Sequence, residues 1–288
     1  MSTIRKSLWQ MFASVIITVF FIICSGAVSV FALPVANPDD IKLLGMVSIG
    51  EEGAAWLRIG KTDVLVTPGY MLTRDLRITA VRQEGVVLYR NQARTYHVLP
   101  PVDELGAGER MRDAMIWCSP MPLWKTIRMI ALAYRKDYIC HGSATVEVAP
   151  RRHVQNMIEM LDFTVTPNHR WHGREGIIYT SPVHVGEADW EWFNRQVRNF
   201  KSARLVPWFN ELAKKGSLIS DGKPLDRVLQ EIGFKIKVPI KWAGAMKFPV
   251  YCSLKNRPWH EIIENILLFN GLGLTPTQEG LVVQGGIR

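Results

Sequence analysis

Two histidines stand at a spacing that metal sites use. His169 and His172 form a His-x-x-His pair, and Arg170 and Arg174 lie beside them. A zinc site needs a third or fourth ligand from the protein or from water, and neighbouring arginines oppose the binding of a cation. We therefore interpret the pair as histidines of a turn and expect no metal site.

Other patterns of catalytic residues are missing from the sequence. It contains no Gly-x-Ser-x-Gly elbow, no His-Glu-x-x-His pair and no Gly-rich phosphate-binding loop. Asp137, Glu147 and Glu159 are scattered, so no carboxylate pair for acid–base chemistry is visible. We expect a protein that is not an enzyme and holds no cofactor.

Three cysteines follow the apolar N-terminal run: Cys118, Cys140 and Cys252. Because their number is odd, at most one disulfide can form within the chain. Cys118 and Cys140 fall in one predicted unit and could pair. The alternative is that all three are small buried apolar residues.

The elements around these residues include one amphipathic pattern that occurs twice. Pro122–Tyr134 returns as Pro224–Phe234, 102 positions later. Each segment has a proline in its first turn, where the missing N–H costs nothing, and apolar residues three or four positions apart. The pattern predicts two equivalent helices.

Flanking elements recur around both helices. Short apolar strands precede them at 116–117 and 218–219, and strand patterns follow at 144–148 and 248–254. A second helix containing Val154 aligns with one containing Trp259 at an offset of 105, and last strands begin at Gly176 and Gly280. The pattern predicts an α+β fold with two βαββαβ units, at 113–182 and 216–288.

The second unit carries the sequence features of a known module. Pro224-Leu225 opens its first helix, Leu268-Phe269-Asn270-Gly271-Leu272 ends its second, and Gly280 enters its last strand. These features resemble the N-domain shared by secretins and TonB-dependent receptors. The first unit departs from it where Phe163-Thr164-Val165 replaces Gly-Leu. The resemblance implies a docking module without catalysis, which lines periplasmic rings and pairs its strand edges or helices with neighbouring subunits.

The N-terminus predicts a membrane anchor. Arg5 and Lys6 precede an apolar run at residues 8–33, longer than the roughly 20 residues that cross a bilayer. The basic pair keeps the tip in the cytoplasm, so residues 1–36 are expected to be the tip and a single transmembrane helix of the inner membrane, with the bulk of the chain in the periplasm. The alternative is a cleaved signal peptide ending at Val30-Phe31-Ala32.

A strand-rich block at 41–100 follows the anchor. Five short runs are typical of strands, and they predict a small antiparallel sandwich or barrel; they lie at 43–49, 54–59, 63–66, 76–81 and 85–89. With Leu44-Gly45-Met46-Val47 and Pro68-Gly69-Tyr70, their order is similar to the homology-region module of the type II secretion clamp protein and of the matching type IV pilus lipoprotein. In the clamp protein such a module follows one anchor and binds a secretin N-domain.

An aromatic stretch at 183–215 joins the two units. Residues 187–200 have the spacing of an amphipathic helix, and a second short helix opens at Pro207. We interpret its aromatic residues as packing between the units. The alternative is a partner-binding surface, for which the candidates are Trp190, Phe193, Arg195 and Trp208. The last strand adds Val282 and Val283 as candidates for pairing at a strand edge.

Composition agrees with a modular exported protein. The chain has 288 residues, of which 48% are hydrophobic, and a formal net charge of +9, which allows two or three small folded domains. The positive charge suits an anionic lipid, a cell-wall polymer or an acidic partner, or is simply a solvated surface. Nucleic acid is not expected outside the cytoplasm.

The sequence therefore predicts a membrane-anchored periplasmic docking or scaffold component of a type II secretion or type IV pilus-like machine. Its expected partner is a secretin or a neighbouring subunit, and a homo-oligomer is possible. The alternative is an envelope accessory protein that binds cell wall or polysaccharide through a basic, Trp-rich surface.

Overall fold

The computed structural model describes residues 38–101, 114–165, 167–183, 208–244 and 246–285. These residues form an α+β fold that is rich in strands and has five α-helices. The predicted anchor at 8–33 lies outside the described residues. Within them, no helix is long and apolar enough to span a bilayer.

The strand-rich block follows a 3-10 turn at Pro38–Asp40 and contains six antiparallel strands, which we call the β module. They are β1 (Ile41–Ile49), β2 (Glu52–Ile59), β3 (Thr62–Val66), β4 (Leu76–Arg82), β5 (Gly85–Arg90) and β6 (Thr95–Leu99). The five predicted strands are confirmed, and β6 was not predicted. β4, β5 and β6 form a sheet of their own.

Two units of similar build follow, which we call the first unit and the second unit. The first contains β7 (Ala114–Cys118), β8 (Met121–Pro122), α2 (Leu123–Ala133), β9 (Asp137–Cys140), β10 (Glu147–Val148), β11 (Arg151–Val154), α3 (Met157–Thr164), β12 (His169–Arg174) and β13 (Ile177–Pro182). The second contains α5 (Phe209–Ala213), β14 (Lys215–Pro224), α6 (Leu225–Ile236), β15 (Ile240–Trp242), β16 (Pro249–Pro258), α7 (Trp259–Phe269), β17 (Leu272–Thr277) and β18 (Gly280–Gly285).

Strand pairing repeats between the two units. β7 pairs antiparallel with β11 in the first unit, and β14 pairs antiparallel with β16 in the second. β13 lies between parallel β9 and antiparallel β12. In the same way, β18 lies between parallel β15 and antiparallel β17. Pro122 and Pro224 directly precede α2 and α6 with nearly equal backbone angles, φ −54° and −56°. The predicted correspondence of the first helices is therefore confirmed.

Two details of the predicted repeat are wrong. The second helices begin at Met157 and Trp259, which are 102 positions apart and not 105. Each unit also closes with a hairpin, β12–β13 or β17–β18, where one strand was predicted. β12 escaped notice because its sequence, HRWHGR, is polar, and β17 because its sequence, LGLTPT, contains glycine and proline.

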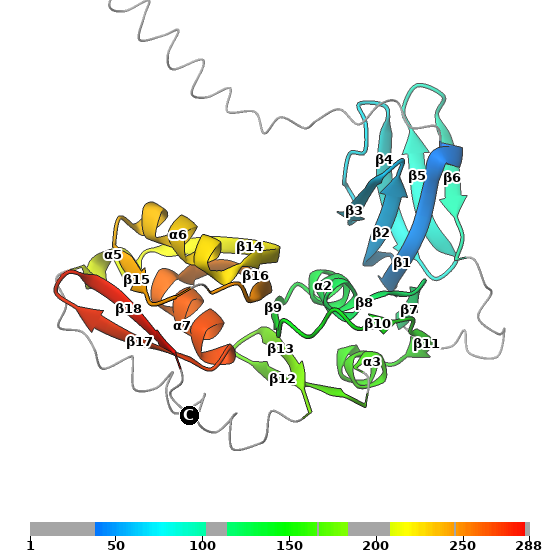
Figure 1. Ribbon diagram of the computed structural model, residues 1–288. Coiled ribbons are helices and arrows are strands. Elements are labelled where there is room, and N and C mark those ends of the chain that lie inside the picture. The colour runs from blue at the N-terminus through cyan, green and yellow to red at the C-terminus, as the bar shows by residue number, and fades with distance from the viewer. Residues whose placement is uncertain (1–37, 102–113, 166, 184–207, 245, 286–288) are drawn as a thin grey trace, which may run out of the picture.

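The three parts are joined by shared sheets. β7 of the first unit pairs with β1 of the β module, which gives the sheet order β11-β7-β1-β2-β3. β9 of the first unit pairs with β16 of the second, which gives the order β12-β13-β9-β16-β14. In Figure 1 the green first unit accordingly lies between the blue–cyan β module and the yellow–red second unit. The predicted boundaries between 41–100, 113–182 and 216–288 thus fall between segments whose strands pair with one another.

Each shared sheet separates two hydrophobic cores. Because neighbouring side chains on a strand point to opposite faces, Tyr138 and Cys140 of β9 enter the core around α2 and α3, while Ile139 enters the core around α6 and α7. In β7, Ile116 enters the α2 core and Trp117 enters the core of the β module. Helices α2 and α3 therefore pack between the two shared sheets, whereas no helix of the described residues contributes to the core of the β module.

Helix α2 contacts all three parts. Trp124 lies edge-on to Trp56 of β2, with ring centroids 6.5 Å apart, and stacks on Tyr251 of β16 at 4.8 Å. Trp56 also donates its indole N–H to the carbonyl oxygen of Lys125 (3.0 Å). We call Trp56, Trp124 and Tyr251 the aromatic ladder, because it runs from the β module through α2 to the second unit.

Candidate functional site

The predicted aromatic surface lies mostly outside the described residues, as do Trp190, Phe193 and Arg195. Trp208 is described and is half-buried. It packs against the core of the second unit and donates its indole N–H to the carbonyl oxygen of Thr277 (3.1 Å). This hydrogen bond ties Trp208 to the second unit. Its packing between the units, or against a partner, stays a prediction.

Val282 and Val283 lie in β18, the central strand of the sheet β15-β18-β17. β15 and β17 occupy both edges of β18. The expectation that these two residues present an open strand edge is therefore wrong. The sequence pattern had not revealed β15 and β17, the two strands that pair with β18. Contact of their side chains with a partner stays a prediction.

His169 and His172 lie in strand β12 and not in a turn. At positions i and i+3 of a strand their side chains point to opposite faces, so they do not converge on one ion. His169 is buried, and its Nε2 is 3.2 Å from Oγ of Ser143. Among the described residues, no group of three His, Cys, Asp or Glu side chains is arranged to hold a metal.

The three cysteines in the described part of the chain are buried and not bonded to one another. Cys140 and Cys252 lie on neighbouring strands, but Cys140 is paired with Tyr251 and Cys252 with Ile139, so their thiols enter different cores. Burial raises the pKa of Cys118 and of Cys252 to about 12. Such thiols are protonated at neutral pH and suit packing better than nucleophilic chemistry.

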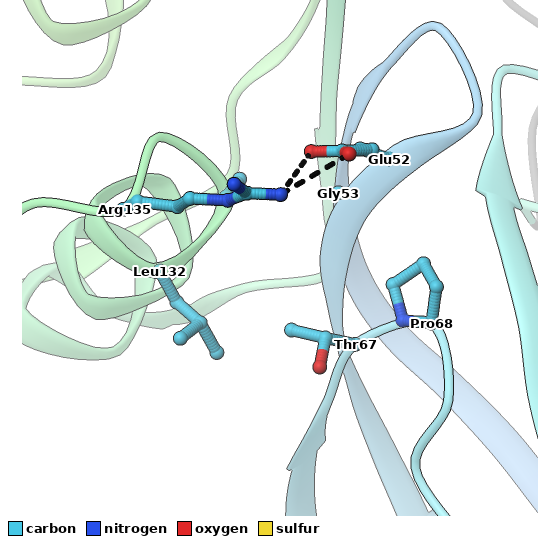
Figure 2. Close-up of a pocket in the computed structure, with 7 residues that line it drawn as sticks. Glu52, Gly53, Thr67, Pro68, Leu132 and Arg135 are labelled. Atoms are coloured by element: carbon cyan, nitrogen blue, oxygen red, sulfur yellow. Dashed lines mark hydrogen bonds and ion pairs between the residues drawn. The ribbon is translucent and has the colours of Figure 1, made fainter.

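Two adjoining hollows flank the C-terminal end of α2, and we treat them as the two halves of one groove. Its first half is a hollow of about 300 Å³ between α2 and the β module, with Leu132, Ala133 and Pro68 among its walls. Arg135 reaches across this hollow to Glu52, with 3.0 Å between Arg135 Nη2 and Glu52 Oε2 (Figure 2). Leu132 and Thr67 face each other beside this ion pair (Figure 2).

The second half of the groove is a hollow of about 380 Å³ between α2 and the second unit. Leu132 and Arg135 line both hollows, which therefore adjoin at these two side chains. The other charged residues of the second half are Lys136, Asp137, Lys255 and Arg257. Four cations and one carboxylate therefore line this half. Arg135 is also paired with Glu52, and Nη1 of Arg257 lies 3.7 Å from Glu261 Oε2. We call Arg135, Lys136, Lys255 and Arg257 the basic groove.

One ion pair fixes the floor of the basic groove. Arg257 donates from Nε to Asp137 (2.6 Å) and from Nη2 to the carbonyl oxygen of Glu175 (2.8 Å), and both charged side chains are largely buried. Asp137 also accepts the backbone N–H of Lys255 (3.1 Å). These contacts hold β9, the β12–β13 turn and β16 together, so the groove is lined by a rigid wall.

The sequence did not reveal this site, since its cations come from segments more than a hundred positions apart. Arg135 and Lys136 could have been noticed as a basic pair directly after a predicted helix. Nothing local connects them with Lys255 and Arg257, which reach the groove only because β9 pairs with β16. Comparison of the chain with models of protein families, with curated proteins and with solved structures gave no match.

Proposed function

We propose that this chain is a non-enzymatic docking component of an envelope machine of the type II secretion or type IV pilus kind. In this proposal residues 8–33 anchor it in the inner membrane and the rest lies in the periplasm, where it binds a secretin or a neighbouring subunit. The sequence resemblances at 41–100 and 216–288 support it. The repeated strand pairing adds that the chain contains two modules of similar build.

The observation that carries the proposal is an open strand edge with exposed apolar side chains. Among the strands of the described residues, β6 pairs with β5 alone, and its residues Tyr96 and Val98 are 67% and 51% exposed. The unpaired edge of a strand presents backbone N–H and C=O groups that a strand of another chain can bind. A partner strand added beside β6 would complete the hydrogen bonds of this edge and cover both side chains.

The alternative of a polysaccharide-binding protein gains less support. It required a Trp-rich surface, but Trp56, Trp117, Trp124 and Trp259 are buried in the cores. Trp171, Trp208 and Trp242 are partly buried against the cores. None of these seven residues offers the exposed aromatic platform that stacking on a sugar needs.

Crosslinking in intact cells tests the proposal. A photoreactive residue would replace Tyr96 in the edge strand and, as the control, Phe234 on the exposed face of α6, which is also highly exposed. The proposal predicts capture of a secretin or pilus ring subunit from position 96 and not from position 234. Capture of glycan, of a second copy of this chain alone, or of no ring subunit would contradict it.

A further inference from the structure

We propose that the basic groove binds a short acidic segment of a partner protein. This inference deepens the docking function proposed above and rests on it for the choice of a protein as ligand. It assigns the recognition of carboxylates to Lys136 and Lys255, with support from Arg135.

The first argument is whether each cation of the groove already forms an ion pair. The charge of Arg257 is largely compensated by Asp137. Lys136 and Lys255 are exposed, and no residue in the described part of the chain forms an ion pair with either of them. Because a lysine head is a mobile point charge on a flexible stem, both ammonium groups can turn toward an anion in the hollow.

Arg135 adds a cation that is easily released. Its pair with Glu52 is solvent-exposed, with side chains 80% and 66% accessible. Exposed pairs of this kind contribute about 0–1 kcal/mol. A carboxylate of the ligand can therefore replace Glu52 at little cost.

The side chains of Arg135 and Lys136 are not needed to cap α2, because their backbone N–H groups do so. The main-chain N–H of Arg135 binds the carbonyl oxygen of Leu132 (3.1 Å), and that of Lys136 binds the carbonyl oxygen of Ala131 (2.8 Å). This is the Schellman arrangement, which already satisfies the last carbonyls of a helix. Its left-handed position is usually glycine, but Arg135 occupies it with φ 54°. This conformation is unfavourable for an L-residue such as arginine.

A protein segment fits the groove better than a lipid headgroup. One half is basic, and the other has Leu132, Ala133 and Pro68 in its walls, so a chain carrying both carboxylates and small apolar side chains suits the two halves. The groove also lies beside the β1–β2 turn, at the far end of a nine-residue strand from Ile41. At about 3.3 Å per residue this turn lies roughly 25–30 Å from Ile41, where the strands of the described residues begin.

The test is peptide binding by the full-length purified protein in detergent. A fluorescein-labelled peptide of alternating glutamate and alanine would be titrated and its anisotropy measured at low and physiological salt. The variant Lys136→Glu/Lys255→Glu reverses both free charges of the groove. Lys42→Glu/Lys61→Glu reverses two exposed lysines of the β module and changes the net charge equally.

We expect peptide binding to be at least about tenfold weaker in Lys136→Glu/Lys255→Glu, the groove variant. In Lys42→Glu/Lys61→Glu, the control variant, it should be less than about twofold weaker. Unchanged melting temperatures would show that both variants fold. Equal weakening by the two variants would mean diffuse attraction and would overturn the proposal, as would no binding of the peptide. Binding of vesicles rich in phosphatidylglycerol in preference to the peptide, lost in the groove variant, would replace it with a lipid site.

The proposed docking function and the proposed peptide site can be refuted independently of each other. Crosslinking from position 96 reports on the strand edge and does not involve the groove, whereas peptide binding needs no secretion machine. If the peptide binds but no ring subunit is captured, the basic groove is a site for acidic segments and the protein works outside a secretion or pilus machine. Capture of a ring subunit without peptide binding would confine docking to the edge strand.

Discussion

Replacing Trp124 by alanine is expected to separate the unfolding of the β module from that of the second unit. Trp124 is 9% exposed and is the middle member of the aromatic ladder, between Trp56 and Tyr251. Truncating a buried tryptophan to alanine costs about 3–5 kcal/mol. Each aromatic pair contributes about 0.5–1.5 kcal/mol beyond the area buried, and here both pairs cross between parts of the molecule.

Trp259→Ala is the matched control. Trp259 is 7% exposed and begins α7, but it packs within the core of the second unit. Both tryptophans also have a lysine ammonium over the ring, at 5.8 Å for Lys125 on Trp124 and 5.7 Å for Lys235 on Trp259. The two substitutions therefore remove similar burial and one similar cation–π contact. They differ in the contacts that join the β module, the first unit and the second unit.

Hydrogen exchange at increasing urea concentrations measures the outcome, because it reports the protection of each strand separately. In the wild type and in Trp259→Ala we expect β2 and β16 to lose protection at the same urea concentration. In Trp124→Ala they should lose it at two different concentrations. If β2 and β16 of Trp124→Ala still open together, shifted as in Trp259→Ala, the ladder does not couple the parts and the reasoning is refuted.

Three further predictions concern single positions. Lys237→Gly should stabilise the protein by up to about 1 kcal/mol, because Lys237 ends α6 in the left-handed region at φ 56°; a lower urea midpoint than wild type would contradict this. Gly216→Ala should lower the melting temperature, with a cost of about 1–3 kcal/mol for overpacking, because a Cβ there would lie 2.2 Å from the Trp259 ring; an unchanged temperature would show that the indole can move. The hydrogen bond from Arg58 lowers the pKa of Asp63, so the charged carboxylate stabilises the fold above the ordinary value of about 3.9 and this contribution is lost as pH falls. Wild type should therefore lose more stability than Asp63→Asn between about pH 5 and pH 3, and parallel stability curves would argue against the ion pair.

Elements with a strong local pattern could be predicted from the sequence. Trp259, Ile262, Ile263 and Ile266 follow one another three or four positions apart or side by side, and all are buried on one face of α7. The first five strands of the β module were found for the same reason, because apolar residues recur along short segments between turns. Both signals depend only on neighbours in the sequence.

Elements whose stability comes from distant partners could not be predicted in this way. β12 is polar along its length and is a strand because β13 pairs with it. β6 carries exposed Tyr96 and Val98, so it lacks the alternation that burial of one face produces. The basic groove depends on the pairing of β9 with β16 over more than a hundred residues, for which a single sequence gives no evidence.

Strands of the shared sheets are buried on both faces, and in β7 this burial is reflected in the sequence. All five residues of β7, Ala114–Cys118, are buried, as are all six of β13, Ile177–Pro182. A strand with one face in water alternates between apolar and polar residues, whereas a strand covered on both faces is apolar at successive positions. A first unit folding alone would expose Met115 and Trp117 of β7, which belong to the core of the β module. The uninterrupted apolar sequence of β7 therefore argues that the first unit needs the β module to cover this strand, so that a partner bound at β6 meets a part that is fixed to the first unit.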